Sequence, residues 1–232
     1  MSDKTSLGNR MKQYENVSRQ LLTRRMPMII RVDGRAFHTL LKNAEKPWDK
    51  NVTIAIADTS LALCRNIVGA KLAYWQGDEI SVLVTDYDQL NTQPWFNKSV
   101  QKIASVSASI ATMAFNQSYK SHIATATFDA RCFVLPKEEV CNYVIWRQQD
   151  AIRNSVQSLA QAFFSHKSLQ NLNCDELILK LSIDKAIDWS QCLDWQKRGA
   201  CTKKDNNGNW KVDWNVPHFI ENREYINKYV NI

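Results

Sequence analysis

The sequence predicts an α+β protein in which an antiparallel sheet is backed by helices. Three observations favour this fold class: short apolar segments rich in β-branched residues, longer segments whose apolar residues recur every three or four positions, and turn-forming residues between them. The order of the segments is β-α-β-β-α-β, which is the order of a split βαβ, or ferredoxin-like, sheet. After residue 166 the character of the sequence changes. We therefore expect a main domain over residues 1–166 and a smaller C-terminal helical and hairpin extension over residues 167–232, packed on it.

Four elements are expected in the first half of the chain. They are an amphipathic helix at about residues 6–22, a strand at 28–33, a second helix at 50–68 and a hairpin at 71–85. The first helix follows from apolar side chains at helical spacing, and Pro27 separates it from the strand. Asp49 or Asn51 is a suitable N-cap for the second helix, and Gly69 is a natural stop.

The second half of the chain predicts a long helix, a strand and another long helix, at about residues 95–118, 125–135 and 138–166. β-branched and aromatic residues favour the strand, and Pro136 ends it. The extension then begins with a short helical stretch at about residues 174–183. A turn-forming sequence at residues 205–209 between two short strands predicts a hairpin there.

Composition and charge limit the classes to which this protein can belong. Of its 232 residues, 44% are hydrophobic and 23% are charged, as in ordinary soluble globular proteins. No apolar run reaches the ~20 residues of a membrane helix, and the N-terminus lacks the apolar core of a signal peptide. Six cysteines without a Cys-x-x-Cys pair indicate reduced thiols, so we expect a cytoplasmic protein with no membrane partner. The net charge of +7 fits a polyanionic partner such as nucleic acid.

Two acidic residues stand where an apolar run meets a turn. Asp33 precedes Gly34 at the end of the first expected strand, and Asp78 follows Gly77 at the tip of the expected hairpin. Carboxylates beside glycines suit Mg²⁺, which prefers oxygen ligands and usually binds one or two carboxylates together with substrate phosphates. A pair of such ions can hold the attacking and leaving oxygens of a phosphoryl displacement. Each motif is also an ordinary turn sequence, so a purely structural role stays open at this point.

Basic side chains lie close to both regions of interest. Arg31, Arg35 and His38 flank the first carboxylate and form the cationic rim that a triphosphate needs. A second basic group lies among the tryptophans of the extension and consists of Lys197, Arg198, Lys203 and Lys204. Basic groups next to tryptophans can bind RNA backbone and bases. The alternative is a surface hairpin whose tryptophans pack inward, and the two interpretations are compatible if the basic groups face solvent.

With these motifs in view, the sequence resembles the tRNA(His) guanylyltransferase family, and in particular its shorter guanylyltransferase-like branch. The matching segments lie in family order and span nearly the whole chain: RVDGRAFH (31–38), KPWD (46–49), QGDEIS (76–81), FDAR (128–131), WRQQDAIRN (146–154), FFSHK (163–167), QKRGACTKK (196–204) and VPHFIENREYI (216–226). The resemblance implies a polymerase-palm-like catalytic domain with two Mg²⁺ ions. It also implies ATP and GTP or another nucleoside triphosphate as substrates, tRNA as partner, and assembly as a homotetramer (a dimer of dimers).

The resemblance assigns roles to individual residues. Asp33, Asp78 and the backbone carbonyl of Gly34 would bind the metal ions, and Glu79 would join the two aspartates in catalysis. The positions that would bind the nucleotide are Asp33, Gly34, Arg35, Ala36, Phe37, His38, Lys46, Gly77, Asp78, Lys98 and Lys102. The positions that would contact RNA are Arg131, Arg147, Arg153, Asn154, Lys197, Arg198, Lys203 and Lys204.

The implied activity is the addition of nucleotides to the 5′ end of tRNA in the 3′-to-5′ direction. ATP activates the tRNA 5′-monophosphate as an adenylylated end, and the 3′-hydroxyl of the incoming nucleotide then displaces AMP. Two departures from the family pattern bear on the substrate. Gly77 replaces the usual serine of the hairpin, and Ile152 stands where eukaryotic members carry the histidine of a His-Ile-Asn-Asn stretch.

The missing histidine favours template-directed repair of 5′-truncated tRNA over addition of the extra 5′ G to tRNA(His). Two further alternatives remain on the sequence alone. One is a palm-type nucleotidyl cyclase, since Gly77, Asp78 and Glu79 resemble the tip of a GGDEF domain. The other is a non-catalytic tRNA-binding protein. The presence of two unpaired acids argues against this alternative, because such acids are costly to bury together without a cation.

Overall fold

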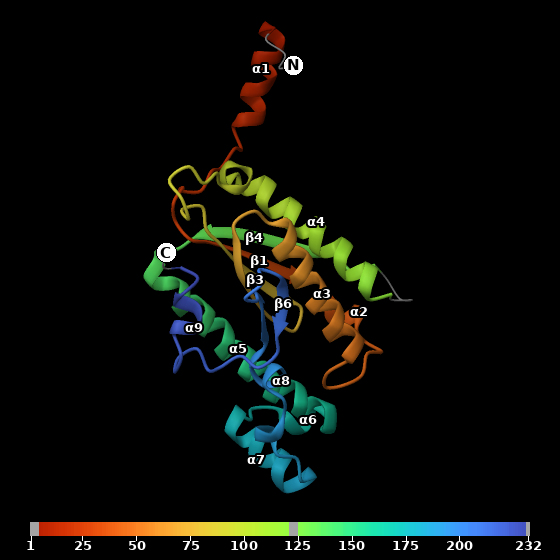
Figure 1. Ribbon diagram of the computed structural model, residues 1–232. Helices are drawn as coiled ribbons and strands as arrows, with labels where there is room; N and C mark the ends of the chain where they lie inside the picture. Colours follow the sequence, from red (N-terminus) through yellow and green to blue (C-terminus); the bar gives the residue numbers. More distant parts are fainter. Residues whose placement is uncertain (1–4, 121–124, 231–232) are drawn as a thin grey trace.

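The computed structural model describes residues 5–120 and 125–230, in which six strands form one antiparallel sheet with helices on both faces (Figure 1). The strand order across the sheet is β4-β1-β3-β2-β5-β6. The strands are β1 (Met28–Gly34), β2 (Ala70–Gln76), β3 (Glu79–Val84), β4 (Phe128–Val134), β5 (Ala200–Lys204) and β6 (Trp210–Asp213). The helices are α1 (Ser6–Asn16), α2 (Phe37–Leu40), α3 (Lys50–Asn66), α4 (Val100–Ser118), α5 (Lys137–Phe163), α6 (His166–Leu169), α7 (Cys174–Lys185), α8 (Asp194–Arg198) and α9 (Glu224–Asn227). Two short 3₁₀ segments are η1 (Trp95–Lys98) and η2 (Trp189–Gln191).

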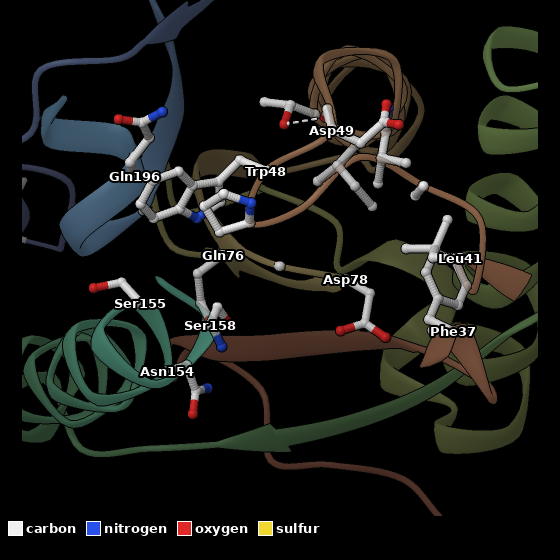
Figure 2. A pocket seen from close by; sticks show the side chains of 18 of the residues that line it. Phe37, Leu41, Trp48, Asp49, Gln76, Asp78, Asn154, Ser155, Ser158 and Gln196 are labelled. Atoms are coloured by element: carbon white, nitrogen blue, oxygen red, sulfur yellow. Dashed lines mark hydrogen bonds between the residues drawn. The ribbon is translucent and has the colours of Figure 1, made fainter. Parts of the chain in front are cut away.

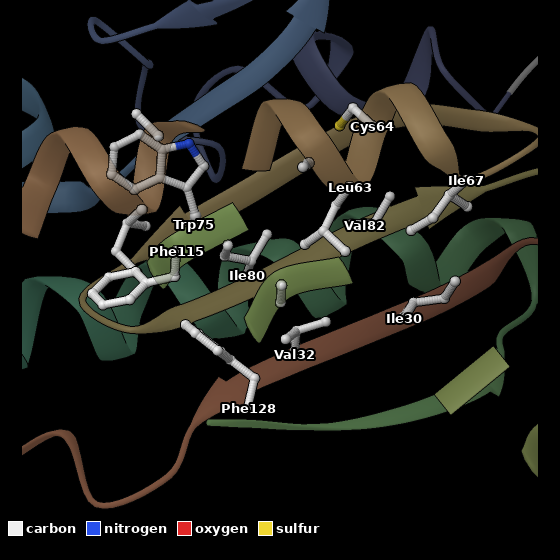
Figure 3. Packing of buried hydrophobic residues seen from close by; sticks show 14 of the residues in the cluster. Ile30, Val32, Leu63, Cys64, Ile67, Trp75, Ile80, Val82, Phe115 and Phe128 are labelled. Carbon is white, nitrogen blue, oxygen red and sulfur yellow. The ribbon is translucent and has the colours of Figure 1, made fainter. Parts of the chain in front are cut away.

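The first four strands and two of the helices form the predicted split βαβ. The chain runs β1-α3-β2-β3-α4-β4, and β1 lies between β3 and β4 in the sheet. Helices α3 and α4 pack against each other and cover one face of the sheet. Alternate strand residues point to that face, among them Ile30, Val32, Ile80 and Val82, which form a core with Leu63 of α3 (Figure 3). The predicted fold class is confirmed.

Helix α5 covers the opposite face of the sheet. Ile29, Tyr74 and Leu83 point to this side and form a second core with Val144 of α5. Phe219, from the segment that precedes α9, completes that core. Because side chains alternate along a strand, the residues of β1 that share this face with Ile29 include Asp33, at the end of the strand.

The segment after residue 166 contributes both strands and helices. The hairpin expected around residues 205–209 is present, and its strands extend the main sheet, since β5 pairs with β2 and β6 pairs with β5. Helix α7 packs on the far end of α5 through Leu159, Leu177 and Leu181. The proposed division of the chain at residue 166 stays a prediction.

The predicted caps and stops around α3 agree with the structure. The Asp49 carboxylate accepts hydrogen bonds from the amides of Asn51 and Val52 at the start of the helix. Gly69 has a φ of +85° beyond the end of the helix, in the left-handed region that favours glycine.

Two predicted helices are shorter than expected. The first ends at Asn16, and the chain beyond it is tied to the body by an isolated bridge between Leu21 and Ser99. Helix α1 itself projects from the rest of the molecule (Figure 1). The helix expected from residue 95 begins only at Val100, because Phe96, Asn97 and Lys98, within η1, have φ values of 47°, 52° and 61° and cannot continue an α-helix. No helix in the described part of the chain is long and apolar enough to cross a membrane.

Candidate active site

Asp33 and Asp78 lie where the end of β1 meets the tip of the β2–β3 hairpin. β1 pairs with β3 so that Asp33 is opposite Glu79, and the amide of Gly34 donates a hydrogen bond of 3.2 Å to the carbonyl of Asp78. Gly77 forms the tip with a φ of +53°. The structure therefore brings together the two acidic motifs that the sequence identified separately.

Gly34 is required by the close packing of this corner. A Cβ atom at position 34 would lie 2.4 Å from the ring of Phe37 and 2.8 Å from the Oδ2 of Asp78. The Phe37 ring cannot move away easily, because it packs edge-on against Phe115 and Phe128 with centroid distances of 5.1 Å each. The absence of a side chain at residue 34 thus lets the hairpin tip approach the end of β1.

The turn at residues 33–38 is held in one shape and faces solvent. The amide of Arg35 donates to the carbonyl of Thr127 at 2.9 Å, and Ala36 has a φ of 54° at the start of α2. Phe37 is buried, whereas Arg35, Ala36 and His38 are exposed. The turn therefore presents backbone and basic side chains at the surface next to the two carboxylates.

The electrostatics of the pair favour a cation. Burial, together with the negative charge of Asp33, raises the pKa of Asp78 from 3.8 to about 6. Among the described residues, neither Asp33 nor Asp78 forms an ion pair with a basic side chain. These residues also contain no cluster of three or more acidic, histidine or cysteine side chains around a common point. Two carboxylates and the Gly34 carbonyl fit Mg²⁺, which takes its remaining ligands from water and phosphate.

Glu79 and Arg147 are bound to each other. Both are buried, and the guanidinium donates two hydrogen bonds of 2.7 Å to the carboxylate. Arg147 also donates to Asp150 at 2.8 Å. This ion pair joins β3 to α5 directly behind the hairpin tip, so the structure gives Glu79 and Arg147 a supporting position beside the carboxylate pair.

A pocket of about 540 Å³ opens beside Asp78 (Figure 2). Its walls come from residues 34–56, from the hairpin tip at residues 75–78, from α5 and from α8. The predicted nucleotide-binding residues among its lining are Gly34, Ala36, Phe37, His38, Lys46, Gly77 and Asp78. A volume of this size is in the range of small-molecule sites.

Much of the pocket lining was not assigned to a nucleotide site from the sequence. These residues include Leu41, Ala44, Trp48, Asp49, Gln76, Ser155, Ser158, Trp195 and Gln196. Trp48 and Trp195 contact each other edge-on at 6.4 Å and close one side of the pocket. The matching segments at residues 46–49, 76–81 and 196–204 include Trp48, Asp49, Gln76 and Gln196. Nothing in the sequence indicated that these distant segments line one pocket.

Lys98 and Lys102 are not brought to this pocket. The ammonium of Lys98 is buried, donates to the carbonyl of Met26 and pairs with Asp86 at 3.4 Å. Met26 precedes the start of β1, whereas Asp33 lies near its end, and seven strand residues span roughly 20 Å. Lys102 is exposed on the first turn of α4, at the same distant end of the sheet. Both lysines therefore lie far from Asp33, and their predicted contact with phosphates stays a prediction.

The predicted RNA contacts are distributed over several surfaces. Arg131 is exposed on the edge strand β4, opposite Arg31, and pairs with Asp129 at 3.2 Å. Among the described residues, the buried Nε of Arg31 has no hydrogen-bond partner. Arg31 shares a sheet face with Asp33, so it adds positive charge beside the carboxylates.

The remaining basic candidates are largely engaged within the molecule. Asp150 binds Arg153 at 2.7 Å and contacts Asn154 at 3.4 Å. Lys197 donates to the carbonyl of Ser190 at 2.6 Å, and Arg198 pairs with Asp194 at 2.5 Å.

The last two candidates lie on β5. Lys203 pairs with Asp213, and Lys204 stacks over Trp210. Lys203 lies opposite Leu72, so both residues are nearer to the start of β2 than to the hairpin tip.

Comparison with known proteins supports one family. The model of the family described as tRNAHis guanylyltransferase (Thg1) matches residues 8–136, which is more than half of the chain. A solved bacterial tRNA(His) guanylyltransferase (Thg1)-like protein in complex with ATP is 49% identical, with a TM-score of 0.95 over 98% of this chain and 100% of that chain. Another, in complex with GTP, is 43% identical, with a TM-score of 0.85 over the same shares of the two chains. The Saccharomyces cerevisiae tRNA(His) guanylyltransferase shares the fold, at 20% identity and a TM-score of 0.72 over 91% of this chain and 97% of that chain.

The fold, the pocket and these matches define a nucleotidyltransferase of the tRNA guanylyltransferase type. The chain belongs to the tRNAHis guanylyltransferase (Thg1) family. This membership favours a nucleotidyltransferase over the cyclase and over the non-catalytic RNA-binding protein.

Proposed function

We propose that this protein repairs 5′-truncated tRNA by adding nucleotides in the 3′-to-5′ direction, with Mg²⁺, ATP and nucleoside triphosphates. The observation that carries the proposal is the corner of Asp33 and Asp78, which the hydrogen bond from the Gly34 amide holds together and in which Asp78 lines a pocket of about 540 Å³. The bacterial Thg1-like proteins solved with ATP and with GTP support nucleotide binding by the same fold.

Asp33 and Asp78 would hold the two Mg²⁺ ions, together with the carbonyl of Gly34. When bound, Mg²⁺ neutralises phosphate charge and polarises the phosphorus under attack. The exposed backbone of the turn at residues 33–38 suits a triphosphate, and His38 and Lys46 line the pocket beside it. These groups would orient the nucleotide.

The proposed reaction has two displacements at phosphorus. An oxygen of the tRNA 5′-monophosphate attacks the α-phosphorus of ATP, and pyrophosphate leaves. The 3′-hydroxyl of the incoming nucleotide then attacks the former 5′-phosphorus of the tRNA, and AMP leaves while the hydroxyl proton passes to solvent. The protein contributes mainly positioning and electrostatic stabilisation, as in phosphoryl transfer generally.

A transcript that lacks its 5′-terminal nucleotide and carries a labelled 5′-monophosphate tests the proposal. ATP, Mg²⁺ and each nucleoside triphosphate are added in turn to the wild type, Asp78→Ala and the control Asp175→Ala, an exposed acid on α7. We expect extension only by the nucleotide complementary to the opposite base, retained in the control and lost in Asp78→Ala. Absence of extension on several truncated tRNAs with intact RNA binding would refute the proposal.

The second candidate is addition of the extra 5′ G to tRNA(His), which the description of the family model favours. Ile152 on α5, in place of the histidine of the eukaryotic stretch, favours repair instead. A full-length tRNA(His) lacking the extra G separates the two: preference for this substrate over truncated tRNAs, with G alone incorporated, would favour the second candidate.

A further inference from the structure

The pocket extends on both sides of Asp78. Figure 2 shows Phe37 and Leu41 on one side of this carboxylate, and Gln76, Asn154, Ser158 and Gln196 on the other. We call the first side the apolar lobe (Phe37 and Leu41). The second side also carries the ring of Trp48, and we call its amide and hydroxyl side chains the polar lobe (Gln76, Asn154, Ser158 and Gln196). A group transfer brings two reactants to the same carboxylates. In this arrangement each reactant can bind on its own side of Asp78.

The polar lobe presents neutral groups that can bind a ligand. The Nδ2 of Asn154 donates to Asp150 at 3.4 Å, which leaves its Oδ1 available. In the described part of the chain, no side-chain hydrogen bond involves Ser158 or Gln76. The Oε1 of Gln196 accepts from the amide of Leu193, which leaves its NH₂ group available. The neighbouring Ser155 is different, because its hydroxyl donates to a backbone carbonyl and accepts from the indole of Trp189.

Charged groups around the polar lobe are neutralised within the protein. Arg147 and Arg153 bind Asp150, and Lys197 and Arg198 lie within 4.0 Å and 2.5 Å of Asp194. These four basic side chains are therefore paired in the described part of the chain and are less available to a triphosphate, whereas amides and hydroxyls suit the edges of bases and the hydroxyls of ribose. The turn at residues 33–38, on the side of the apolar lobe, has the exposed backbone and basic groups instead.

We propose that the polar lobe binds the 5′-terminal nucleoside of the RNA while the apolar lobe and the turn hold the nucleoside triphosphate. This inference rests on the proposed function. Side-chain amides and hydroxyls offer both donors and acceptors, so the lobe accepts any of the four bases. That tolerance is what templated addition requires, because pairing with the opposite strand then selects the nucleotide.

The test compares Asn154→Ala/Ser158→Ala with Leu41→Ala, and uses Gln157→Ala as the matched control. Gln157 is an exposed neighbour on the same helix that does not line the pocket. Alanine favours helix, so the two α5 substitutions leave the fold intact. Initial rates are measured over ranges of truncated tRNA and of nucleotide, with four transcripts that differ in the first base pair to be restored.

We expect the KM for RNA to rise roughly tenfold in the α5 double variant, as for two lost neutral hydrogen bonds, with the KM for nucleotide unchanged. The rise should be similar for all four transcripts. Leu41→Ala should show the reverse pattern, and Gln157→Ala should match the wild type. Suppose that the wild type is active but the double variant keeps the wild-type KM for RNA or raises only the KM for nucleotide. The inference about the polar lobe is then refuted, while the proposed function stands. If the wild type extends no RNA, the proposed function fails as well.

Discussion

The amide of Gly34 lies 3.2 Å from the carbonyl oxygen of Asp78 and donates a hydrogen bond to it. This contact joins the end of β1 to the tip of the β2–β3 hairpin, so Asp33 and Asp78 are positioned as a unit. The missing side chain at residue 34 permits the approach, because a Cβ there would lie 2.8 Å from the Asp78 carboxylate. The corner thus holds two like charges close together without a basic partner among the described residues, which is costly to the protein alone and favourable once a cation binds.

Asp78→Asn should make the metal-free protein more stable while abolishing nucleotide addition. The pKa of Asp78 is raised from 3.8 to about 6, so the folded state binds a proton that the unfolded state releases between these values. The stability from this proton is present at low pH and lost as the pH rises through about 6. Denaturant unfolding at pH 7.5 should show a gain of roughly 1 to 3 kcal/mol for the variant, vanishing below pH 4. An unchanged or lower free energy of unfolding of Asp78→Asn at pH 7.5 would contradict the unfavourable burial of the Asp78 charge beside Asp33.

The pH profile of nucleotide addition should shift with Mg²⁺ concentration. Metal binding requires the ionised Asp78, so activity should fall as the pH decreases through about 6. Because Mg²⁺ competes with the proton, raising its concentration should move the acidic limb to lower pH. Rates measured at low and at saturating Mg²⁺ between pH 5 and 8 check this. An acidic limb at the same pH under both conditions would argue against Asp78 as a metal ligand.

Arg147→Ala should destabilise the fold by about 3 to 5 kcal/mol, because it leaves the buried carboxylate of Glu79 without its partner. Replacing both members, as in Glu79→Leu/Arg147→Met, should recover most of this loss in urea unfolding. Arg153→Ala is the matched control, since Arg153 also binds Asp150 but is exposed. An Arg147→Ala protein of wild-type stability that has lost affinity for tRNA would instead support the predicted RNA contact.

The sequence predicted the split βαβ because its signals are local. Apolar periodicity, the Asp49 cap and the Gly69 stop each depend on residues within a few positions of one another. The features that were missed depend on long-range contacts. Nothing near Glu79 indicates that Arg147 binds it, and nothing in the hairpin at residues 200–213 specifies pairing with β2. The polar lobe could not be predicted for the same reason, because Gln76, Ser158 and Gln196 meet only through the packing of α5 and α8 beside the hairpin.

Lys98→Met should lower the stability of the folded protein without weakening nucleotide binding. Lys98 and Asp86 are both buried, and the φ values of residues 96–98 turn the lysine toward the carbonyl of Met26 and the carboxylate of Asp86. Methionine keeps most of the packing but leaves Asp86 without a counter-charge, which should cost about 3 to 5 kcal/mol. Lys102→Met is the control, because Lys102 is exposed one turn further along and should change stability by less than about 0.5 kcal/mol. The measurements are thermal unfolding and the KM for ATP. If either variant instead raises the KM for ATP at unchanged stability, the lysine reaches the phosphates during the reaction, as the family resemblance implied.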